Sequence, residues 1–260
     1  MDASKDISGR VAIVTGGTSG LGLGICIKFA KLGCKVAFTG RSQEKGDKAK
    51  GEIIEGAGCP PENLLFICAD VAEENNAKVM VETTVSEFGK LDFLINNAGV
   101  TGKPATLVES TAEDFARVMQ INVLGMFFCM KYGIAQLQSQ PKLEKGCYAV
   151  VNISSVAGMI PFPSQAAYCA SKHAVIGLTR TAAKEVAKDN IKVNSVCPGL
   201  IQTSVSDEVF SKEALEQVFQ MQAIGRLGQP EEIADAVFVA CTSPFMMGHS
   251  FVVDGGWTCY

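Results

Sequence analysis

The stretch Arg10-Val-Ala-Ile-Val-Thr-Gly-Gly-Thr-Ser-Gly-Leu-Gly22 runs from an apolar segment directly into a cluster of glycines. The residues after it, 23–32, have the composition of a helix. A buried strand, a glycine-rich turn and a helix N-terminus in this order form a binding site for a dinucleotide pyrophosphate, because glycines let the backbone approach the phosphates. The spacing G-x-x-x-G-x-G differs from the commonest fingerprint, so an ordinary tight turn between strand and helix stays the alternative.

The same alternation of short apolar runs and helical segments continues along the chain. Further strands are expected at 35–39, 64–68, 91–95, 149–153, 191–196 and 250–254. Helices are expected at 44–55, at 73–88, from Ser110 or Thr111 onward by a capping-box pattern, at 165–188 with Ser164 as its cap, and from Pro230 onward. This order predicts an α/β protein with a three-layer, doubly wound parallel sheet. The 260 residues contain no linker-like window, so we expect one domain over 1–260, with a substrate lid at 204–227.

Composition argues against several classes of protein. A formal charge of −4 and a pI near 5.3 disfavour a nucleic-acid partner, which requires a basic surface. The polar first residues and the lack of an apolar run of membrane-spanning length predict a cytoplasmic protein that makes no membrane contact. Ten cysteines without a C-x-x-C pair are expected to be reduced core residues. Only two histidines are present, so no metal site is expected.

Polar residues follow several of the expected strands, at the edge of the sheet where ligands of such folds bind. Asp70, Asn97 and Ser155 all fall at these strand ends. After the second strand, where a NAD site usually has an acidic residue, the chain has Gly40-Arg41-Ser42. Arg41 can pair with a 2′-phosphate, so NADP(H) is favoured over NAD(H). The alternative is that Arg41 is an ordinary surface arginine.

The helix expected at 165–188 carries Tyr168 and Lys172 four residues apart, on one face. A free phenol titrates near pH 10, which is too high for acid–base catalysis in a cell, and an adjacent ammonium would lower that pKa. Ser155 could offer its hydroxyl to the same substrate oxygen. Taken alone, the pair also fits a packed ring under a solvated ammonium. Asn122 lies inside another expected helix, where Asn is disfavoured, so a buried functional amide and a solvated one are both open.

Together these segments resemble the short-chain dehydrogenase/reductase family over residues 10–257. The markers are T-G-x-x-x-G-x-G at Thr15–Gly22, N-N-A-G at Asn96–Gly99, and the set Ser155, Tyr168 and Lys172. The resemblance implies a Rossmann fold. It also implies hydride transfer between a nicotinamide cofactor and a small secondary alcohol or ketone, without a metal.

The resemblance also implies roles for single residues. Tyr168 would exchange a proton with the substrate oxygen, Lys172 would lower the pKa of Tyr168 and bind the nicotinamide ribose, and Ser155 would orient the carbonyl. Asn122 would hold a water that links Lys172 to solvent. Many NADP-using members have a basic residue where Ser19 stands here. The implied cofactor site consists of Gly16, Thr18, Ser19, Gly20, Leu21, Gly22, Arg41, Ser42, Asp70, Val71, Asn97, Ala98, Gly99, Tyr168, Lys172, Pro198, Gly199, Ile201 and Thr203.

Two other functions share most of these motifs. A 3-oxoacyl carrier-protein or CoA thioester reductase would need a basic patch, for which only Lys103 and Arg117 are candidates. A dinucleotide sensor without turnover would usually lack one of the four catalytic side chains. A third class, the enoyl reductases, differs in its motif because it would space Tyr and Lys more widely. The side chains of Met159, Ile160 and Phe162 suggest an apolar substrate pocket.

A stripe of small residues runs along the helix that carries Tyr168, on the opposite face. Such a face lets another helix approach closely. Members of the family pair this helix and the Asn122 helix across a dimer face, so the resemblance implies a homo-oligomer, either a dimer or a tetramer. The stripe consists of Ala166, Ala170, Ala174 and Gly177.

Overall fold

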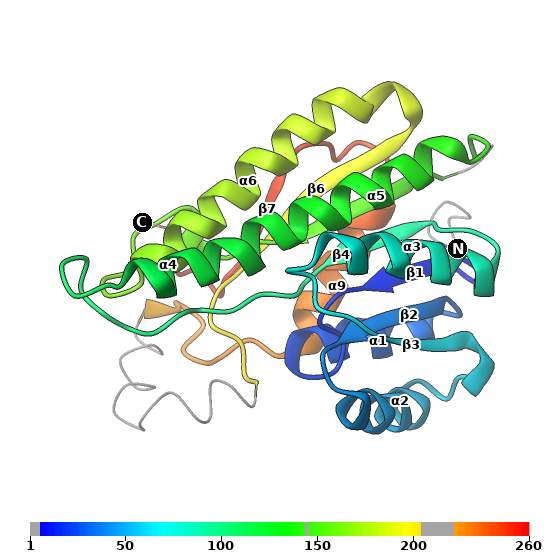
Figure 1. The fold of residues 1–260 in the computed structure, drawn as a ribbon, viewed down its shortest axis with the longest axis horizontal. Helices are drawn as coiled ribbons and strands as arrows, with labels where there is room; N and C mark the ends of the chain where they lie inside the picture. The colour runs from blue at the N-terminus through cyan, green and yellow to red at the C-terminus, as the bar shows by residue number, and fades with distance from the viewer. Residues whose placement is uncertain (1–5, 144–145, 204–220, 260) are drawn as a thin grey trace.

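The computed structural model describes residues 6–143, 146–203 and 221–259, and its centre is one parallel sheet (Figure 1). The strand order is β3-β2-β1-β4-β5-β6-β7. Because the order reverses between β1 and β4, their carboxyl ends flank the crevice where such sheets bind ligands. The predicted doubly wound α/β fold is therefore confirmed. The strands are β1 (Val11–Val14), β2 (Lys35–Gly40), β3 (Leu64–Cys68), β4 (Phe93–Asn96), β5 (Tyr148–Ile153), β6 (Ile191–Pro198) and β7 (Ser250–Val253).

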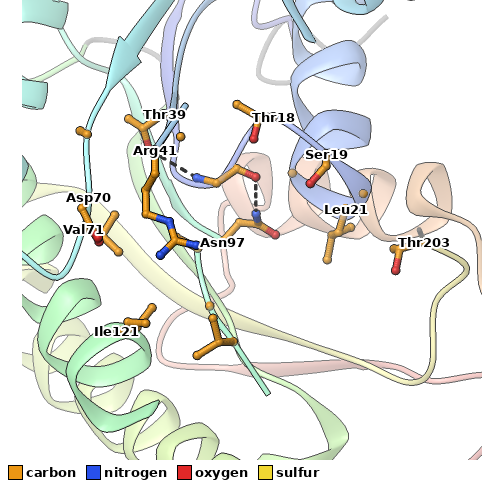
Figure 2. Close-up of a pocket in the computed structure, with 18 residues that line it drawn as sticks. Thr18, Ser19, Leu21, Thr39, Arg41, Asp70, Val71, Asn97, Ile121 and Thr203 are labelled. Atoms are coloured by element: carbon orange, nitrogen blue, oxygen red, sulfur yellow. Dashed lines mark hydrogen bonds between the residues drawn. The ribbon is translucent and has the colours of Figure 1, made fainter. Parts of the chain in front are cut away.

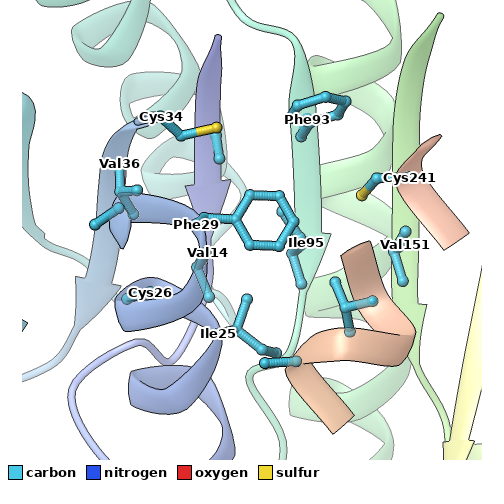
Figure 3. Close-up of a cluster of buried hydrophobic side chains, with 14 of the residues drawn as sticks. Val14, Ile25, Cys26, Phe29, Cys34, Val36, Phe93, Ile95, Val151 and Cys241 are labelled. Atoms are coloured by element: carbon cyan, nitrogen blue, oxygen red, sulfur yellow. The ribbon is translucent and has the colours of Figure 1, made fainter. Parts of the chain in front are cut away.

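Helices cover both faces of the sheet and complete the three layers (Figure 1). One face carries α1 (Gly20–Lys31), α2 (Gln43–Ala57) and α9 (Pro230–Thr242). The other carries α3 (Glu74–Phe88), α4 (Ala112–Met119), α5 (Met126–Ser139) and α6 (Ala166–Val186). Figure 3 shows the first layer's core, where Phe29 of α1 packs edge-on against Phe93 with ring centroids 6.0 Å apart. Burial of these apolar side chains holds α1, and with it the glycine turn, against the sheet.

The long helix expected from residue 110 or 111 onward is interrupted. Thr111 caps α4, since its Oγ1 accepts a hydrogen bond from the Asp114 amide at 3.2 Å. The Asp114 carboxylate does not reach back to the cap, because it accepts from the Lys103 amide instead. Between α4 and α5 the chain forms a π-helical turn, Gln120–Gly125, which contains Asn122. Such turns are frequent at functional sites.

The segment Ala112–Ser139 is long and apolar enough to cross a bilayer by length and composition alone, with a mean hydropathy of 1.3. The expectation that no segment reaches that length is wrong by this test. In the structure the segment packs on the sheet, with 39% of its most apolar stretch buried. The core helix of a soluble protein passes the same test, so this finding is weak evidence for a membrane.

Ser164 does not cap α6. The N-cap is Gln165, and no side chain caps the helix. Ser164 has the left-handed backbone angle φ 64°, and its carbonyl accepts a hydrogen bond from the Ala105 amide at 3.0 Å. The chain therefore turns sharply to meet Ala105 before the helix begins, and this turn removes Ser164 from the capping position. Most of the lid expected at 204–227 lies outside the described residues.

All ten cysteines are free thiols, as predicted. Seven are buried, and their burial fits small apolar core residues. Cys68 and Cys259 are exposed, so the core assignment is wrong for these two. Cys68 ends the edge strand β3, and Cys259 follows β7 near the chain end.

Candidate active site

The glycine turn after β1 requires glycine at several positions. Gly16 and Gly20 have φ angles of 66° and 53°, which side chains rarely adopt. A Cβ on Gly22 would collide with the Gly16 carbonyl oxygen and would lie 2.5 Å from Nδ2 of Asn97. The backbone of residues 16–22 therefore leaves room for a ligand at the N-terminus of α1, and we call this turn the glycine cradle. Amide groups and the helix dipole favour an anion there.

This cradle opens into a cavity of about 340 Å³ along the ends of β1, β2, β3 and β4. Figure 2 shows Arg41 extending into it, with Asp70 and Val71 on one side and Asn97 on the other. The predicted residues that line it are Gly16, Thr18, Ser19, Gly20, Leu21, Gly22, Arg41, Asp70, Val71, Asn97, Ala98, Gly99 and Thr203. Sequence reasoning missed Thr39, Gly40, Ala69, Val100 and Ile121.

Ser42 is the predicted cofactor residue that the structure places elsewhere. It does not line the cavity. Its Oγ accepts a hydrogen bond from the Lys45 amide at 3.3 Å and caps α2. A serine before a helix is a common cap, so the local sequence also carried this signal.

A second cavity of about 540 Å³ adjoins the first and is lined by the predicted catalytic residues Ser155, Tyr168 and Lys172. The two share Leu21, Asn97, Gly99, Val100 and Thr203 as lining residues. The predicted residues in the second cavity also include Ser155, Tyr168, Lys172, Pro198, Gly199 and Ile201. A dinucleotide lying in the first cavity would therefore end beside Tyr168. The lining residues not predicted are Thr101, Gly102, Pro104, Ile153, Ser154, Gln165 and Leu200.

Tyr168 and Lys172 lie together at this second cavity. The Lys172 ammonium lies 5.5 Å from the centre of the Tyr168 ring and donates a hydrogen bond to the Ile153 carbonyl at 2.8 Å. Burial lowers the pKa of Lys172 to about 8. Burial also raises the pKa of Tyr168, while its hydrogen bond with Ser155 acts in the opposite direction.

The expectation of a lowered phenol pKa is therefore wrong for Tyr168. Desolvation disfavours the phenolate more than the neighbouring groups favour it. At neutral pH the phenol is protonated, which is the form that can donate a proton to a carbonyl oxygen. Ser155, whose Oγ accepts from the Ala157 amide at 3.1 Å, holds its hydroxyl at the same wall of the cavity.

The catalytic helix is fixed against β5 by close contacts that the sequence did not reveal. Ser154 is buried, and its Oγ donates to the Lys172 carbonyl at 3.0 Å. A Cβ on Gly158 would lie 2.7 Å from that same carbonyl oxygen. The loop after β5 and the first turns of α6 are thus too close to move independently, and this contact sets the position of Tyr168 relative to Ser155.

Asn122 is buried and connects three parts of the site. Its Nδ2 donates to the Val100 carbonyl at 2.8 Å and to Ser171 Oγ at 2.9 Å, and its Oδ1 accepts from the Val100 amide at 2.8 Å. Both amide hydrogens are therefore used within the protein. Asn122 positions Ser171, the neighbour of Lys172, and its role in a water relay stays a prediction.

Asn97 also has structural partners. Its Nδ2 donates to the carbonyls of Thr15 and Gly16 at 3.0 and 3.1 Å. These bonds join the end of β4 to the glycine turn, and Figure 2 shows the bond from Asn97 to Gly16. Contact of Asn97 with a ribose stays a prediction, which its place in both cavities supports.

The apolar side chains expected to form the substrate pocket lie elsewhere. Met159, Ile160 and Phe162 do not line the second cavity. Phe162 packs against Trp257 with ring centroids 5.0 Å apart, and Ile160 joins the same small cluster. Met159 is 45% exposed. The apolar walls come instead from residues near the ends of β5 and β6, including Ile153, Leu200 and Ile201.

The chain resembles known proteins over nearly its whole length. Residues 16–258 match a family model described as enoyl-(acyl carrier protein) reductase. The chain is 35% identical over 257 residues to cyclohexanol dehydrogenase of Acinetobacter sp., covering 98% of this chain and 97% of that protein. The chain belongs to the short-chain dehydrogenase/reductase family. Family membership confirms the resemblance drawn from the sequence motifs.

Two further relatives of this short-chain dehydrogenase/reductase bear on its function. A 3-oxoacyl-[acyl-carrier-protein] reductase of Synechocystis sp. is 34% identical over 258 residues, covering 98% of this chain and 99% of that protein. The structure of ElxO with NADP bound superposes with a TM-score of 0.88 at 33% identity, covering 96% of this chain and 99% of that chain. The relatives are oxidoreductases, and the chain is an enzyme of that class.

Proposed function

We propose that this enzyme transfers a hydride between a nicotinamide cofactor and a secondary alcohol or ketone, with Tyr168 as the general acid and base. One observation carries the proposal. Tyr168, Ser155 and Lys172 line a cavity that shares a wall with the cavity over the glycine turn. The phenol of Tyr168, the hydroxyl of Ser155 and the ammonium of Lys172 therefore lie together. They lie where a cofactor that begins at the glycine turn would have its other end.

The residues present fit a dinucleotide. A side chain at Gly22 would fill the cradle, and α1 presents its N-terminus there. When bound, the nicotinamide supplies or accepts the hydride. The chain's own part is to hold the substrate oxygen between Ser155 and Tyr168 and to move one proton at the phenolic oxygen. Lys172 would stabilise the phenolate that forms when this proton leaves.

The measurement that tests the activity is nicotinamide oxidation by the purified protein, with NADPH and separately NADH. The panel should include cyclic ketones, diketones, 3-oxoacyl thioesters and steroids. Turnover of ketones is expected. A protein that binds cofactor tightly and turns over no member of the panel would contradict this proposal and favour the sensor.

We expect NADP(H) to be preferred because Arg41, just after β2, extends into the first cavity (Figure 2), where the adenosine of a bound dinucleotide would lie. Arg41 is exposed and makes no ion pair with an acid among the described residues. The relative ElxO has NADP bound in its structure. Arg41 thus has its guanidinium available for a 2′-phosphate, which it can bind through two charge-assisted hydrogen bonds.

Replacing Arg41 by Ala is expected to raise the Kd for NADPH by about 10- to 100-fold, since a hydrogen bond to a charged group contributes roughly 1.5–3 kcal/mol. The Kd for NADH, which lacks the 2′-phosphate, should change little. Fluorescence titration with both cofactors measures this, and Lys31→Ala, an exposed position at the end of α1, is the matched control. An equal rise in Kd for NADPH and NADH would show that Arg41 does not bind the 2′-phosphate.

Among the relatives, acyl-carrier-protein reductases are the main competing function. Their protein carrier is acidic and needs basic side chains near the site. Here the Arg117 guanidinium already pairs with Asp114, at 2.9 Å, and the Asp114 carboxylate also accepts from the Lys103 amide. The Lys103 amide and Arg117 hold the pKa of Asp114 below its usual value, so this acid stays charged beside the candidate patch. We therefore favour a small alcohol or ketone over a carrier-bound thioester. The four-residue Tyr168–Lys172 spacing disfavours an enoyl reductase.

We also propose a homo-oligomer. In Figure 1, α4, α5 and α6 lie side by side on one face of the protein. On this face Phe115, Leu124 and Phe127 are each 40–44% exposed, and Ala170 and Gly177 of the small-residue stripe are exposed as well. Large apolar side chains beside a flat stripe are typical of an interface between subunits.

Phe127→Glu is expected to shift the protein toward monomer, because a charge buried in an apolar interface costs about 2 kcal/mol or more. Light scattering of the eluting protein measures the mass. Val79→Glu, a 41% exposed position on α3, is the matched control and should leave the mass unchanged. A wild-type protein that is monomeric at micromolar concentration would contradict the proposal.

A cytoplasmic location is proposed on the cysteines. Ten free thiols without a disulfide fit a reducing compartment.

A further inference from the structure

The catalytic cavity has walls from two separate parts of the chain. Tyr168 and Lys172 lie on α6, and the hydrogen bond from Ser154 to the Lys172 carbonyl fixes this helix against the end of β5. Another wall is formed by residues 198–201, at the end of β6, and we call it the β6 wall. Reacting atoms must meet at a defined distance, and a displacement of about 1 Å can cost about 100-fold in rate. The contacts that hold the β6 wall therefore bear on the reaction.

The backbone of Leu200, in the β6 wall, is held by groups from outside the sheet. The pairing of β6 with β7 ends at Val253, whose carbonyl accepts from the Gly199 amide at 3.0 Å. The next amide, of Leu200, donates to Oε1 of Gln222 at 2.7 Å. The Leu200 carbonyl accepts from the Gly228 amide at 3.0 Å. A single side chain, 22 residues further along the chain, thus takes up the Leu200 amide where the strand pairing stops.

Gln222 is buried, with 2% of its surface exposed, and both ends of its side-chain amide are bonded. While Oε1 accepts from Leu200, Nε2 donates to the Arg226 carbonyl. A Cβ on Gly199 would lie 2.6 Å from Gln222 Oε1, so the amide packs directly against the Gly199 backbone. A buried amide is costly unless its polar atoms are paired, and here the pairing gives the side chain one defined position.

The turn that carries Gln222 is itself anchored at two places. The Ile224 amide donates to the Gly255 carbonyl at 3.0 Å, just after β7. The Arg226 guanidinium bonds both carboxylate oxygens of Glu232, in the first turn of α9, at 2.8 Å each. Gln222 therefore connects the β6 wall to the end of β7 and to α9.

We propose that Gln222 is a positioning residue for the reaction: it holds the backbone of Gly199 and Leu200, and with it the β6 wall, in register with Tyr168. Gln222 lines neither cavity, so it acts through these backbone groups and touches neither substrate nor cofactor. The inference rests on the proposed function and adds to it a residue outside the sequence motifs.

Gln222→Met tests the proposal, because methionine has a similar length but no donor and only a weak acceptor. We expect kcat for ketone reduction with NADPH, per folded protein, to fall by about 10- to 100-fold, as for other displacements within an active site. The Kd for NADPH, measured by fluorescence titration, should stay within about threefold of wild type, because the glycine cradle and Arg41 are untouched.

Gln140→Met is the matched control. Gln140 also bonds both backbone groups of one residue, Leu91, at 2.8 and 2.7 Å, but it lies near the start of β4 and lines neither cavity. Its loss should lower the free energy of unfolding, as the loss of Gln222 does, while kcat stays within about twofold of wild type. If the two variants lower kcat equally, or if neither lowers it, Gln222 is merely structural and the proposal is overturned.

Gln222→Glu provides a second, reversible test. A protonated carboxyl has one donor and one acceptor, as the pairing with Arg226 and Leu200 requires, whereas a carboxylate cannot donate. Burial and the Asp254 carboxylate in the same small cavity would both raise the pKa of this carboxyl, while the Arg226 guanidinium is engaged by Glu232. The ratio of variant to wild-type kcat should be near one at about pH 5.5 and fall about tenfold by about pH 7.5. A constant ratio would contradict the positioning role.

The outcomes separate this inference from the proposed function. If ketones are reduced by the wild type and equally well by Gln222→Met, the inference fails alone. If the wild type reduces no ketone, the proposed function fails, and hydrogen exchange of the Leu200 amide tests the contact without turnover. Faster exchange in Gln222→Met, but not in Gln140→Met, would support Gln222 as the residue that fixes the β6 wall. Unchanged exchange in both would overturn it.

Discussion

Replacing Tyr168 by Phe is expected to lower kcat/KM for ketone reduction by about 10²- to 10⁴-fold, the range that general acid–base catalysis contributes. The substitution removes one oxygen, so the ring keeps its contacts with the cavity wall. The loss should fall on kcat more than on KM, because the phenol transfers its proton only in the transition state. Steady-state kinetics with saturating cofactor measure it.

The control for this prediction is Tyr132→Phe on α5. The Tyr132 hydroxyl bonds to Glu74 at 3.0 Å on the surface and Tyr132 lines neither cavity, so its removal should leave kcat/KM within about twofold of wild type. Cofactor binding to the Tyr168→Phe protein should persist, since the phenol oxygen is not part of the glycine cradle. A Tyr168→Phe enzyme with near-normal kcat would refute its assignment as the proton donor.

The fold and much of the site could be predicted because their signals are local. Strands appear as short apolar runs, and the glycine turn and the Tyr168–Lys172 spacing lie within a few consecutive residues. The structure places these segments at neighbouring strand ends, as the parallel order of the sheet requires. The place of Arg41 in the cavity could likewise be predicted, because Arg41 directly follows β2.

What the sequence could not show depends on residues far apart in the chain. Asp92 is fully buried, accepts from the Val11 amide at 2.8 Å and pairs with Lys90 and Arg10 at the start of β1 and β4. Nothing in its neighbourhood predicts an ion pair with a residue 82 positions earlier.

The same limit applies near the active site. The contact of Ser154 with the Lys172 carbonyl requires the exact packing of α6 on β5. The left-handed turn at Ser164 arises from pairing with Ala105, 59 residues earlier, so a capping rule based on local sequence failed there.

The raised pKa of Tyr168 also depends on packing between residues that are far apart in the chain. From sequence, only the ammonium of Lys172 was visible, and it lowers a phenol pKa. Burial of both groups, which acts in opposite directions on their pKa values, emerges only from the packed structure.

Replacing Lys172 by Met is expected to lower kcat/KM by about 10²- to 10³-fold, the loss typical when one charge-stabilising donor is removed from an active site. It should also change the pH dependence. In the wild-type enzyme the pKa of Lys172 is about 8, so ketone reduction should decline as pH rises through 8 and the ammonium is lost. The variant should lack this decline, which a pH profile of kcat/KM measures. A wild-type rate that is flat from pH 7 to 9.5 would contradict the role of the ammonium.

The pH dependence of the free energy of unfolding, measured without cofactor, tests the pKa of Lys172 independently. The folded pKa of Lys172, about 8, lies below the ordinary value of 10.5, so between these pH values the unfolded chain binds a proton that the native state does not. The destabilisation is fully present below pH 8 and is removed as pH rises toward 10.5, by about 1.4 kcal/mol per unit. Denaturant unfolding of wild type minus Lys172→Met should show this rise, because subtraction cancels groups common to both. If the difference is independent of pH, burial does not shift Lys172, and the decline in rate near pH 8 must come from another group.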